Sequence, residues 1–382
     1  MTVVETMKNS HCLSSSITVM QYNGVWKPDG LTHRGEVAYK IFGVVTQVFL
    51  FYFMILAEIG YVYTFLDNVE RVVDAAVLLF SHLVQAVKVL TIILRQERIK
   101  RMIQVADGPA FTKSDPKLKA ILEGTTSLAA NIGNMVLLSA FTTGIFWSIV
   151  PALNPELTLP LRTAYPFDIN GPYIFAAMYA YSTISVTVSG VGDAAENFLV
   201  SGMFTIASAQ LDVLREELEA IGVEGYSAEN FEKATRCVQY HQRIIGYVEE
   251  MADIFGLPIF CQFVISSVVI CMTIYKITVT KEPVEMVTMV FYLICVFMEL
   301  LMYCYPGDVL LNKSLLISDA AYPNDWSGDR KTSRVLLLVA MRAQRPLVID
   351  AGGLFRVCLP TAAAVVQTAY SYYALLRQQL QD

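Results

Sequence analysis

Charged residues are scarce in this sequence of 382 residues, because Asp, Glu, Lys and Arg together make up only 16% of it. Soluble domains carry about a quarter charged residues, so the deficit argues for a protein that lies in a membrane. The net charge of -6 gives no reason to expect nucleic acid as a partner. The first forty residues contain no long apolar run, and we therefore expect no cleaved signal peptide.

Residues that could carry enzyme chemistry are also few. The four histidines are scattered and form no His-x-x-x-His pair or other metal-ligand spacing. Gly190-Val191-Gly192 is too short for a nucleotide-binding loop, and it follows an apolar segment rather than a strand. We expect no metal site, no cofactor and no enzyme activity.

Long apolar segments are what the sequence has in abundance. A helix needs about 20 mostly apolar residues to cross the hydrocarbon core of a bilayer. Seven segments qualify: 41–63, 72–94, 128–150, 173–191, 254–275, 286–305 and 354–376. The sequence therefore predicts an all-α protein with seven transmembrane helices.

Lys and Arg residues are unequally distributed between the two sides of these spans. The segments on the side of the amino terminus hold 21 of them, and those on the other side hold 5. The positive-inside rule then places the amino terminus in the cytosol and the carboxyl terminus outside. None of the seven cysteines falls in a predicted outer loop, so we expect no disulfide.

The predicted spans divide the chain into six parts. They are a cytosolic arm (1–40), spans one to four (41–192), a cytosolic helical extension (193–253), spans five and six (254–305), a second cytosolic segment (306–350), and span seven with an outer tail (351–382).

Two cytosolic stretches have the pattern of amphipathic helices. The first carries apolar residues at three- and four-residue steps after Ser227, a candidate N-cap: Phe231, Ala234, Val238, Gln242, Ile245, Val248 and Ala252. In the second, Val335, Leu338 and Met341 share one face. Such helices either cap the membrane domain or form a layer in which subunits meet, and the pattern favours neither.

Ionisable residues within spans are costly and each needs an explanation. Glu58, Asp74 and Lys88 lie within a few turns of predicted helix ends, and this favours side chains that extend toward the interface. Glu299 and Arg356 are candidates for facing a water-filled path, which the sequence alone does not decide.

Aromatic and methionine side chains in the outward halves of spans two to five form a candidate binding site for a small apolar ligand. Ordinary packing is the commoner role of any one such residue. The alternative is an apolar pocket with a few hydroxyl groups. The candidates are Phe80, Phe146, Trp147, Met178, Tyr179, Met272 and Tyr275.

Span seven differs in composition from the other six. Thr361, Thr368 and Ser371 lie on one stripe, with Gln367 beside it and many alanines between. Small and polar residues in a span usually indicate close helix packing. A pore wall is the alternative.

The last eighty residues contain motifs that resemble those of insect odorant receptors. They are Tyr305-Pro306-Gly307-Asp308 with Ser314, then Ala321-Tyr322 and Trp326, then Met341-Arg342-Ala343-Gln344-Arg345-Pro346, and the ending Gln367-Thr368-Ala369-Tyr370-Ser371-Tyr372-Tyr373-Ala374-Leu375-Leu376. The chain lacks the long insertion between spans four and five that is expected of the odorant co-receptor. It therefore resembles an odorant-binding tuning subunit.

The resemblance implies a ligand-gated, non-selective cation channel in the plasma membrane of sensory neurons, where lipid surrounds its spans. The channel would be a heterotetramer with the odorant co-receptor, gated by a small volatile ligand bound between the outer parts of spans two to six. Span seven would line the pore, with Gln367, Tyr370, Tyr373, Leu376 and Arg377 as candidate lining residues.

Two other receptor classes share the seven spans. A gustatory-type channel formed by one kind of subunit has the same topology, but its ending typically carries a Gln-Phe pair that is missing after Thr368-Ala369-Tyr370. A G-protein-coupled receptor needs the opposite orientation and an Asn-Pro motif in span seven. The only Asn-Pro here, Asn154-Pro155, falls in a predicted outer loop.

Overall fold

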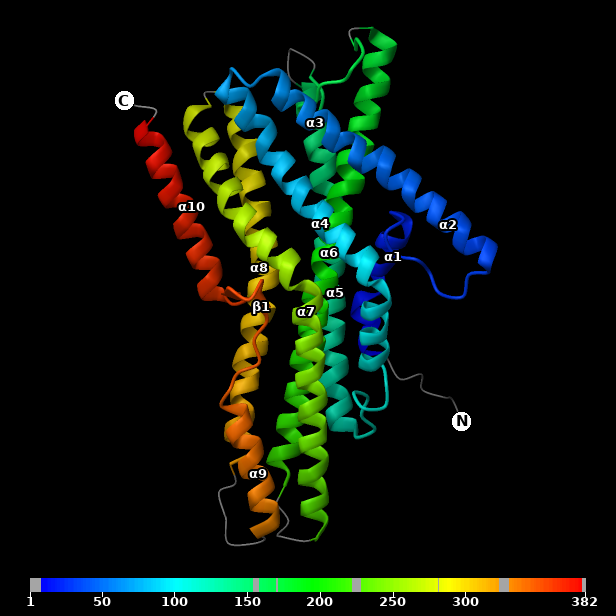
Figure 1. Ribbon diagram of the computed structural model, residues 1–382, viewed down its shortest axis with the longest axis vertical. Helices are drawn as coiled ribbons and strands as arrows, with labels where there is room; N and C mark the ends of the chain where they lie inside the picture. Colours follow the sequence, from blue (N-terminus) through cyan, green and yellow to red (C-terminus); the bar gives the residue numbers. More distant parts are fainter. Residues whose placement is uncertain are drawn as a thin grey trace.

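The computed structural model describes residues 8–153, 158–169, 171–221, 228–280, 282–322 and 330–379. The described chain forms an elongated bundle of helices whose axes run roughly along one direction (Figure 1). The elements are η1 (Asn9–Leu13), α1 (Ser14–Tyr22), α2 (His33–Thr46), η2 (Gln47–Tyr52), α3 (Phe53–Thr64), α4 (Val69–Ala106), α5 (Pro116–Leu153), α6 (Pro172–Glu219), α7 (Ala228–Val279), α8 (Pro283–Ala320), α9 (Arg330–Ala343), β1 (Asp350–Ala351), β2 (Phe355–Arg356) and α10 (Leu359–Gln379).

Six described helical runs are long and apolar enough to cross a membrane. The first comprises α2, the π-helical turn η2 and α3, which follow one another without a break over 33–64. The other five are α4 to α8, and each contains one predicted span. With α10 as the seventh helix, the prediction of an all-α fold with seven spans is confirmed.

Span seven begins later than the sequence suggested. We predicted a helix from residue 354, but the chain first forms a two-stranded hairpin, β1 with β2, and α10 begins at Leu359. Gly352 and Gly353 make the turn, with φ angles of 60° and 71°. Glycine adopts such positive angles without steric cost, which explains why these two residues end the extended segment. Arg356, placed in the span by the sequence, lies exposed in β2.

Helix α6 runs through the middle of the bundle and contacts α5, α7, α8 and the amino-terminal elements (Figure 1). Small residues let its neighbours approach closely. A Cβ atom at Gly202 would overlap the Leu13 side chain of η1, which is fully buried. Beside it, burial raises the pKa of the Cys12 thiol to about 12, so this cysteine acts as an apolar packing residue. All seven cysteines are free.

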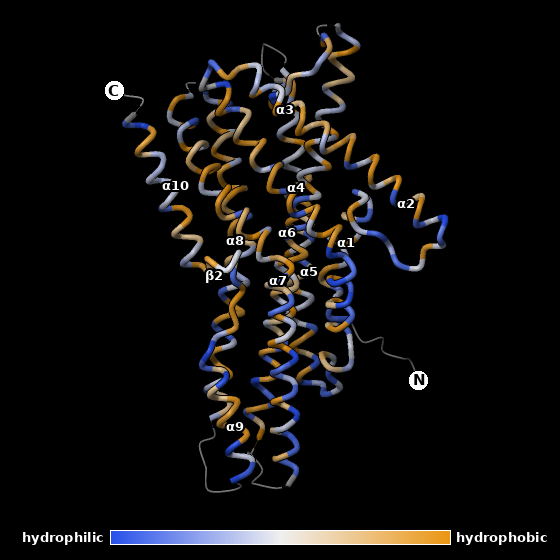
Figure 2. Tube along the Cα trace, in the orientation of Figure 1, coloured by the Kyte–Doolittle hydropathy of each residue, from blue (hydrophilic) through white to orange (hydrophobic). Residues whose placement is uncertain are grey.

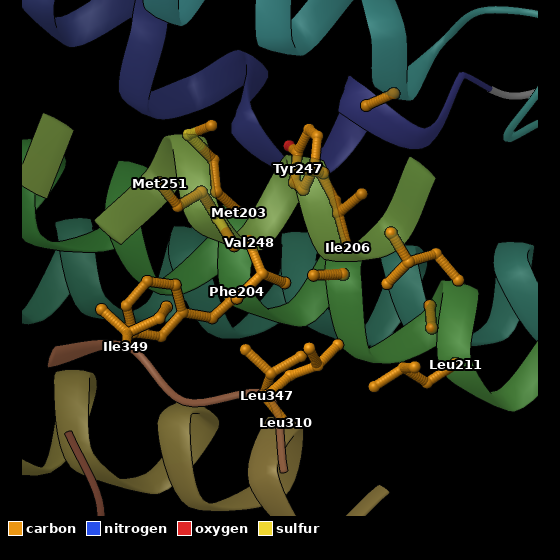
Figure 3. Close-up of a cluster of buried hydrophobic side chains, with 14 of the residues drawn as sticks. Met203, Phe204, Ile206, Leu211, Tyr247, Val248, Met251, Leu310, Leu347 and Ile349 are labelled. Atoms are coloured by element: carbon orange, nitrogen blue, oxygen red, sulfur yellow. The ribbon is translucent and has the colours of Figure 1, made fainter. Parts of the chain in front are cut away.

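The lower half of the bundle has a solid apolar core (Figure 3). Met203 and Phe204 of α6 meet Tyr247 and Met251 of α7, and Leu347 closes the cluster from the segment before β1. Figure 2 shows that the chain in this lower half carries more hydrophilic residues than the upper half does. Packing between helices, rather than lipid, therefore covers the apolar stripes here.

Most of the predicted stripe on α7 faces the core, because Ala234 and Val248 are buried and three further members pack against the core: Val238, Ile245 and Ala252. The predicted Gln242 is exposed. The prediction left out Cys237, which is buried and packs as a small hydrophobe. Ser227, Trp326 and Asn154-Pro155 lie outside the described residues.

On α9 the predicted face is largely the exposed one. Leu338 and Met341 are 64% and 58% exposed, while Leu336, Val339 and Ala340 are buried. Both sides of this short helix carry apolar residues, so periodicity alone gave no reason to prefer the correct one.

The motif residues of α8 hold the segment 347–358 that leads into α10. A Cβ atom at Gly307 would overlap the carbonyl oxygen of Val357, so only glycine permits this approach. Asp308 accepts a hydrogen bond from the Leu359 amide at 3.4 Å, and Ser314 accepts one from the Leu347 amide at 2.9 Å. These contacts fix where α10 starts.

Replacing Gly307 with alanine should separate α8 from Val357 and destabilise the protein. Overpacking against backbone costs about 1–3 kcal/mol, so the thermal unfolding midpoint of the detergent-solubilised chain should fall by several degrees. Gly246→Ala is the matched control, because nothing lies within 4 Å of a Cβ atom there and alanine favours a helix. Equal midpoints for the two variants would show that the Gly307 contact is not a constraint.

Candidate ligand-binding site

Helices α4 to α8 enclose a cavity of about 560 Å³ in the upper half of the bundle. All five helices contribute to its wall, and they contain predicted spans two to six. Its apolar lining includes Leu78, Val136, Trp147, Val186, Ile265, Val269, Phe291, Tyr292, Val296 and Met302. Ligand sites are typically concave and mostly apolar with a few placed polar groups, and this cavity has both features.

Two of the seven predicted ligand-binding residues lie at the cavity wall or directly behind it. Trp147 lines the cavity, and its indole N–H donates to the carbonyl of Pro160 at 3.1 Å, which fixes the ring. Phe146 is 36% exposed and lies outside the described lining, but its ring centroid is 5.3 Å from that of Phe291, which does line the cavity.

The other five predicted residues lie elsewhere. Phe80, Met272 and Tyr275 pack beside α10, in the cluster described below. Met178 and Tyr179 lie nearer the upper end of α6, where the Tyr179 hydroxyl donates to the carbonyl of Ser148. The candidates were chosen by side-chain type and depth, and neither criterion tells which face of a helix points inward.

A network of polar side chains forms the lower boundary of the cavity. Lys88 is 5% exposed, and its Nζ donates to Asp193 Oδ1 at 3.0 Å, to Asn197 Oδ1 at 2.8 Å and to Glu299 Oε1 at 2.6 Å. Asn197 Nδ2 donates to Asp193 Oδ2 at 2.9 Å and to Glu299 Oε1 at 3.0 Å. The Tyr303 hydroxyl donates to Asn197 Oδ1. Asp193, Asn197 and Glu299 line the cavity.

This network corrects the expectation that Lys88 extends toward the membrane interface. Its ammonium group instead joins α4 to α6 and α8 in the interior. Glu58 is also buried, 1% exposed, and bonds His82 with an Oε2–Nδ1 distance of 2.9 Å. Asp74 pairs with Lys276 of α7. The two members of each pair lie on different helices, so an analysis of one span at a time could not identify these pairs.

A small apolar cluster connects the cavity to α10. Val269 of α7 and Val296 of α8 line the cavity and also belong to a buried cluster with Val77, Ala369 and Tyr373. Ala369 and Tyr373 come from α10. One layer of side chains therefore separates the cavity from the seventh helix.

The predicted pore residues divide between two faces of α10. Gln367, Tyr370, Leu376 and Arg377 are exposed, while Tyr373 is 7% exposed and points into the cluster with Val77. Tyr373 therefore does not belong to the exposed face of this helix in the single chain. The described residues contain no group of three or more His, Cys, Asp or Glu side chains arranged to hold a metal ion.

Comparison with known proteins relates this geometry to one family. The family model described as 7tm Odorant receptor matches residues 68–370. The chain is 21% identical to odorant receptor Or1 of Anopheles gambiae, over 94% of this chain and 93% of that one. It is 25% identical to odorant receptor 85c of Drosophila melanogaster over 58% of this chain, and the match spans only 57% of that receptor's length.

The fold has a solved counterpart. The structure of olfactory receptor OR5 from Machilis hrabei in complex with eugenol superposes with a TM-score of 0.85 at 14% identity, covering 96% of this chain and 97% of that one. At this level of sequence identity the match supports only a shared fold. The family model covers most of the chain and confirms the resemblance seen in the carboxyl-terminal motifs, so this chain belongs to the 7tm odorant receptor family.

Proposed function

We propose that this chain is the odorant-binding subunit of a ligand-gated, non-selective cation channel. The observation that carries the proposal is the shared wall, in which Val269 and Val296 line the cavity and also pack on α10. A ligand that changes how α7 and α8 pack around the cavity changes the surface on which α10 rests. Cores are close-packed, so such a change is transmitted rather than absorbed.

Gating then follows from a difference in affinity. A ligand shifts the equilibrium between closed and open packings only as far as it binds one of them more tightly. An apolar ligand of about ten heavy atoms can supply roughly 8 kcal/mol, enough for micromolar binding. The open packing is the one in which α10 moves away from the channel axis.

The pore is formed by the exposed face of α10 from several subunits. Gln367 and Tyr370 lie on this face, and Leu376 and Arg377 near its upper end. A Gln367 amide exposed to lipid would have no hydrogen-bond partner. The same amide facing a water-filled pore could bond to water, so the pore is the more favourable position. The lysine and arginine distribution favours a cytosolic amino terminus, which places this upper end outside the cell.

The partner is the odorant co-receptor, and the assembly is a heterotetramer in the plasma membrane of sensory neurons. Leu337, Leu338 and Met341 of α9 are exposed at the lower end of the bundle, among hydrophilic surroundings (Figure 2). An exposed apolar patch outside the lipid region marks a contact with another protein. The extension of α6 and α7 to the same end supports a cytosolic layer where subunits meet.

Co-expression with an odorant co-receptor should produce a fast cation current on odorant application, because the pore needs subunits of both kinds. Whole-cell current is measured with G-protein signalling blocked, in cells that express this chain alone or with the co-receptor. Current from this chain alone would favour the gustatory-type homomer. A response that disappears when G proteins are blocked would contradict the channel function.

Ligand choice and ion selectivity should change independently. Trp147→Ala enlarges the cavity and should change the order of odorant potencies, while relative ion permeabilities stay the same. Gln367→Glu adds a carboxylate on the exposed face of α10 and should raise the permeability of Ca²⁺ relative to Na⁺ without changing that order. Reversal potentials and dose–response curves measure the two effects, and the opposite pattern would exclude this division of roles.

Leu338→Glu should impair assembly with the co-receptor, because it buries a carboxylate in the contact formed by α9. Co-purification of the two subunits should fall several-fold. Leu338→Met keeps the surface apolar and serves as the control. Undiminished co-purification of the glutamate variant would remove α9 from the proposed interface.

A further inference from the structure

At the lower boundary of the cavity, every hydrogen-bond donor of the Lys88 network has a partner, but one acceptor receives none of these bonds. The donors are the three ammonium protons of Lys88, the two amide protons of Asn197 and the hydroxyl proton of Tyr303. Lys88 makes three bonds, Asn197 two and Tyr303 one, so no donor remains for a ligand. These bonds end on Asp193, on Asn197 Oδ1 and on Glu299 Oε1, and none of these three donors reaches Glu299 Oε2.

The orientation of these groups is fixed by charge. Asn197 must turn its Oδ1 toward the ammonium group of Lys88, because the ammonium needs an acceptor and the amide nitrogen of Asn197 is only a donor. Its Nδ2 is thereby turned toward the carboxylates of Asp193 and Glu299. The carboxyl groups of Asp193 and Glu299 share the single ammonium group of Lys88, and the Glu299 side chain keeps 19% of its surface exposed.

One wall of the cavity offers a second free acceptor. Gln262 is 5% exposed and lines the cavity; its Nε2 donates one of its two protons to Ser266 Oγ at 3.0 Å, while its Oε1 is buried without a partner among the described residues. Buried acceptors without a donor cost free energy, and a ligand that supplies a donor recovers it.

We infer that this cavity selects small apolar ligands that carry a hydrogen-bond donor, such as a hydroxyl group, which Glu299 Oε2 accepts at the lower boundary. The inference rests on the proposed function, because it names the ligand class of the same cavity. A carbonyl-bearing analogue brings a further acceptor toward a carboxylate and leaves Glu299 and Gln262 unsatisfied.

The test compares benzyl alcohol with benzaldehyde, which have the same ring and number of heavy atoms but differ in the donor. Membranes from cells that express the full chain are incubated with radiolabelled benzyl alcohol, and membranes without the chain correct for partition into lipid. We expect benzaldehyde to compete about tenfold more weakly than unlabelled benzyl alcohol, the ratio that corresponds to about 1.4 kcal/mol. Equal competition would overturn the inference.

Glu299→Gln provides the sharper variant. Its Oε1 still accepts from Lys88 and Asn197, so the amide nitrogen takes the position of Oε2 and turns an acceptor into a donor. Direct binding of labelled benzyl alcohol and labelled benzaldehyde should then show the preference lost or reversed. Gly246→Ala lies outside the cavity lining, where nothing is within 4 Å of the added Cβ atom, and it should leave the tenfold ratio intact. An unchanged ratio in Glu299→Gln would also overturn the inference.

Gln262→Met removes the second acceptor without touching the Lys88 network, and it serves if the Glu299 variant does not reach the membrane. The preference for benzyl alcohol should then fall several-fold, and a full preference would contradict the inference. These experiments measure binding and do not depend on channel opening, so they test the ligand class independently of the proposed channel function. The expected binding ratio without any odorant-evoked current would remove the channel function alone.

Discussion

The buried ammonium group of Lys88 is the constraint on which the rest of the membrane domain depends. An isolated charge in such a place costs several kcal/mol, so it requires Asp193, Asn197 and Glu299 at hydrogen-bond distance. These partners come from α6 and α8 and fix the register of both helices against α4. Any rotation of α6 that moved Asp193 away would leave an uncompensated charge in the interior. Three of the five helices around the cavity are thereby held in one arrangement.

The network also divides the bundle into two parts of different character. Above it the helices enclose the cavity, and below it Phe204, Met251 and Leu347 belong to the large buried apolar core. The core below the network holds the helices around the cavity in place, because α6, α7 and α8 run through both regions. A ligand therefore acts on the upper ends of helices whose lower ends are fixed, and α10 lies beside these upper ends.

The apolar segments of the sequence predicted the number of membrane spans, but not which faces their helices bury. Apolar length alone identifies a span, so the segments 41–63 to 286–305 lie within the observed helices. The face of a helix depends on its neighbours, which explains the misplaced stripe on α9 and why the candidates Phe80 and Tyr275 lie in the cluster beside α10 rather than in the cavity lining. Lys88 was misjudged for the same reason, since Asp193 and Glu299 are over a hundred residues away.

The motifs behind the family resemblance lie at a different place from the cavity. Gly307, Asp308 and Ser314 contact Val357, Leu359 and Leu347, which lead into α10, and none of the six is in the described lining. The motifs thus encode how the seventh helix is attached, a requirement that does not depend on the ligand. The groups that face a ligand, Glu299 and Gln262, carry no such signature. Family membership therefore follows from the sequence, whereas the ligand class follows only from counting donors and acceptors in the folded chain.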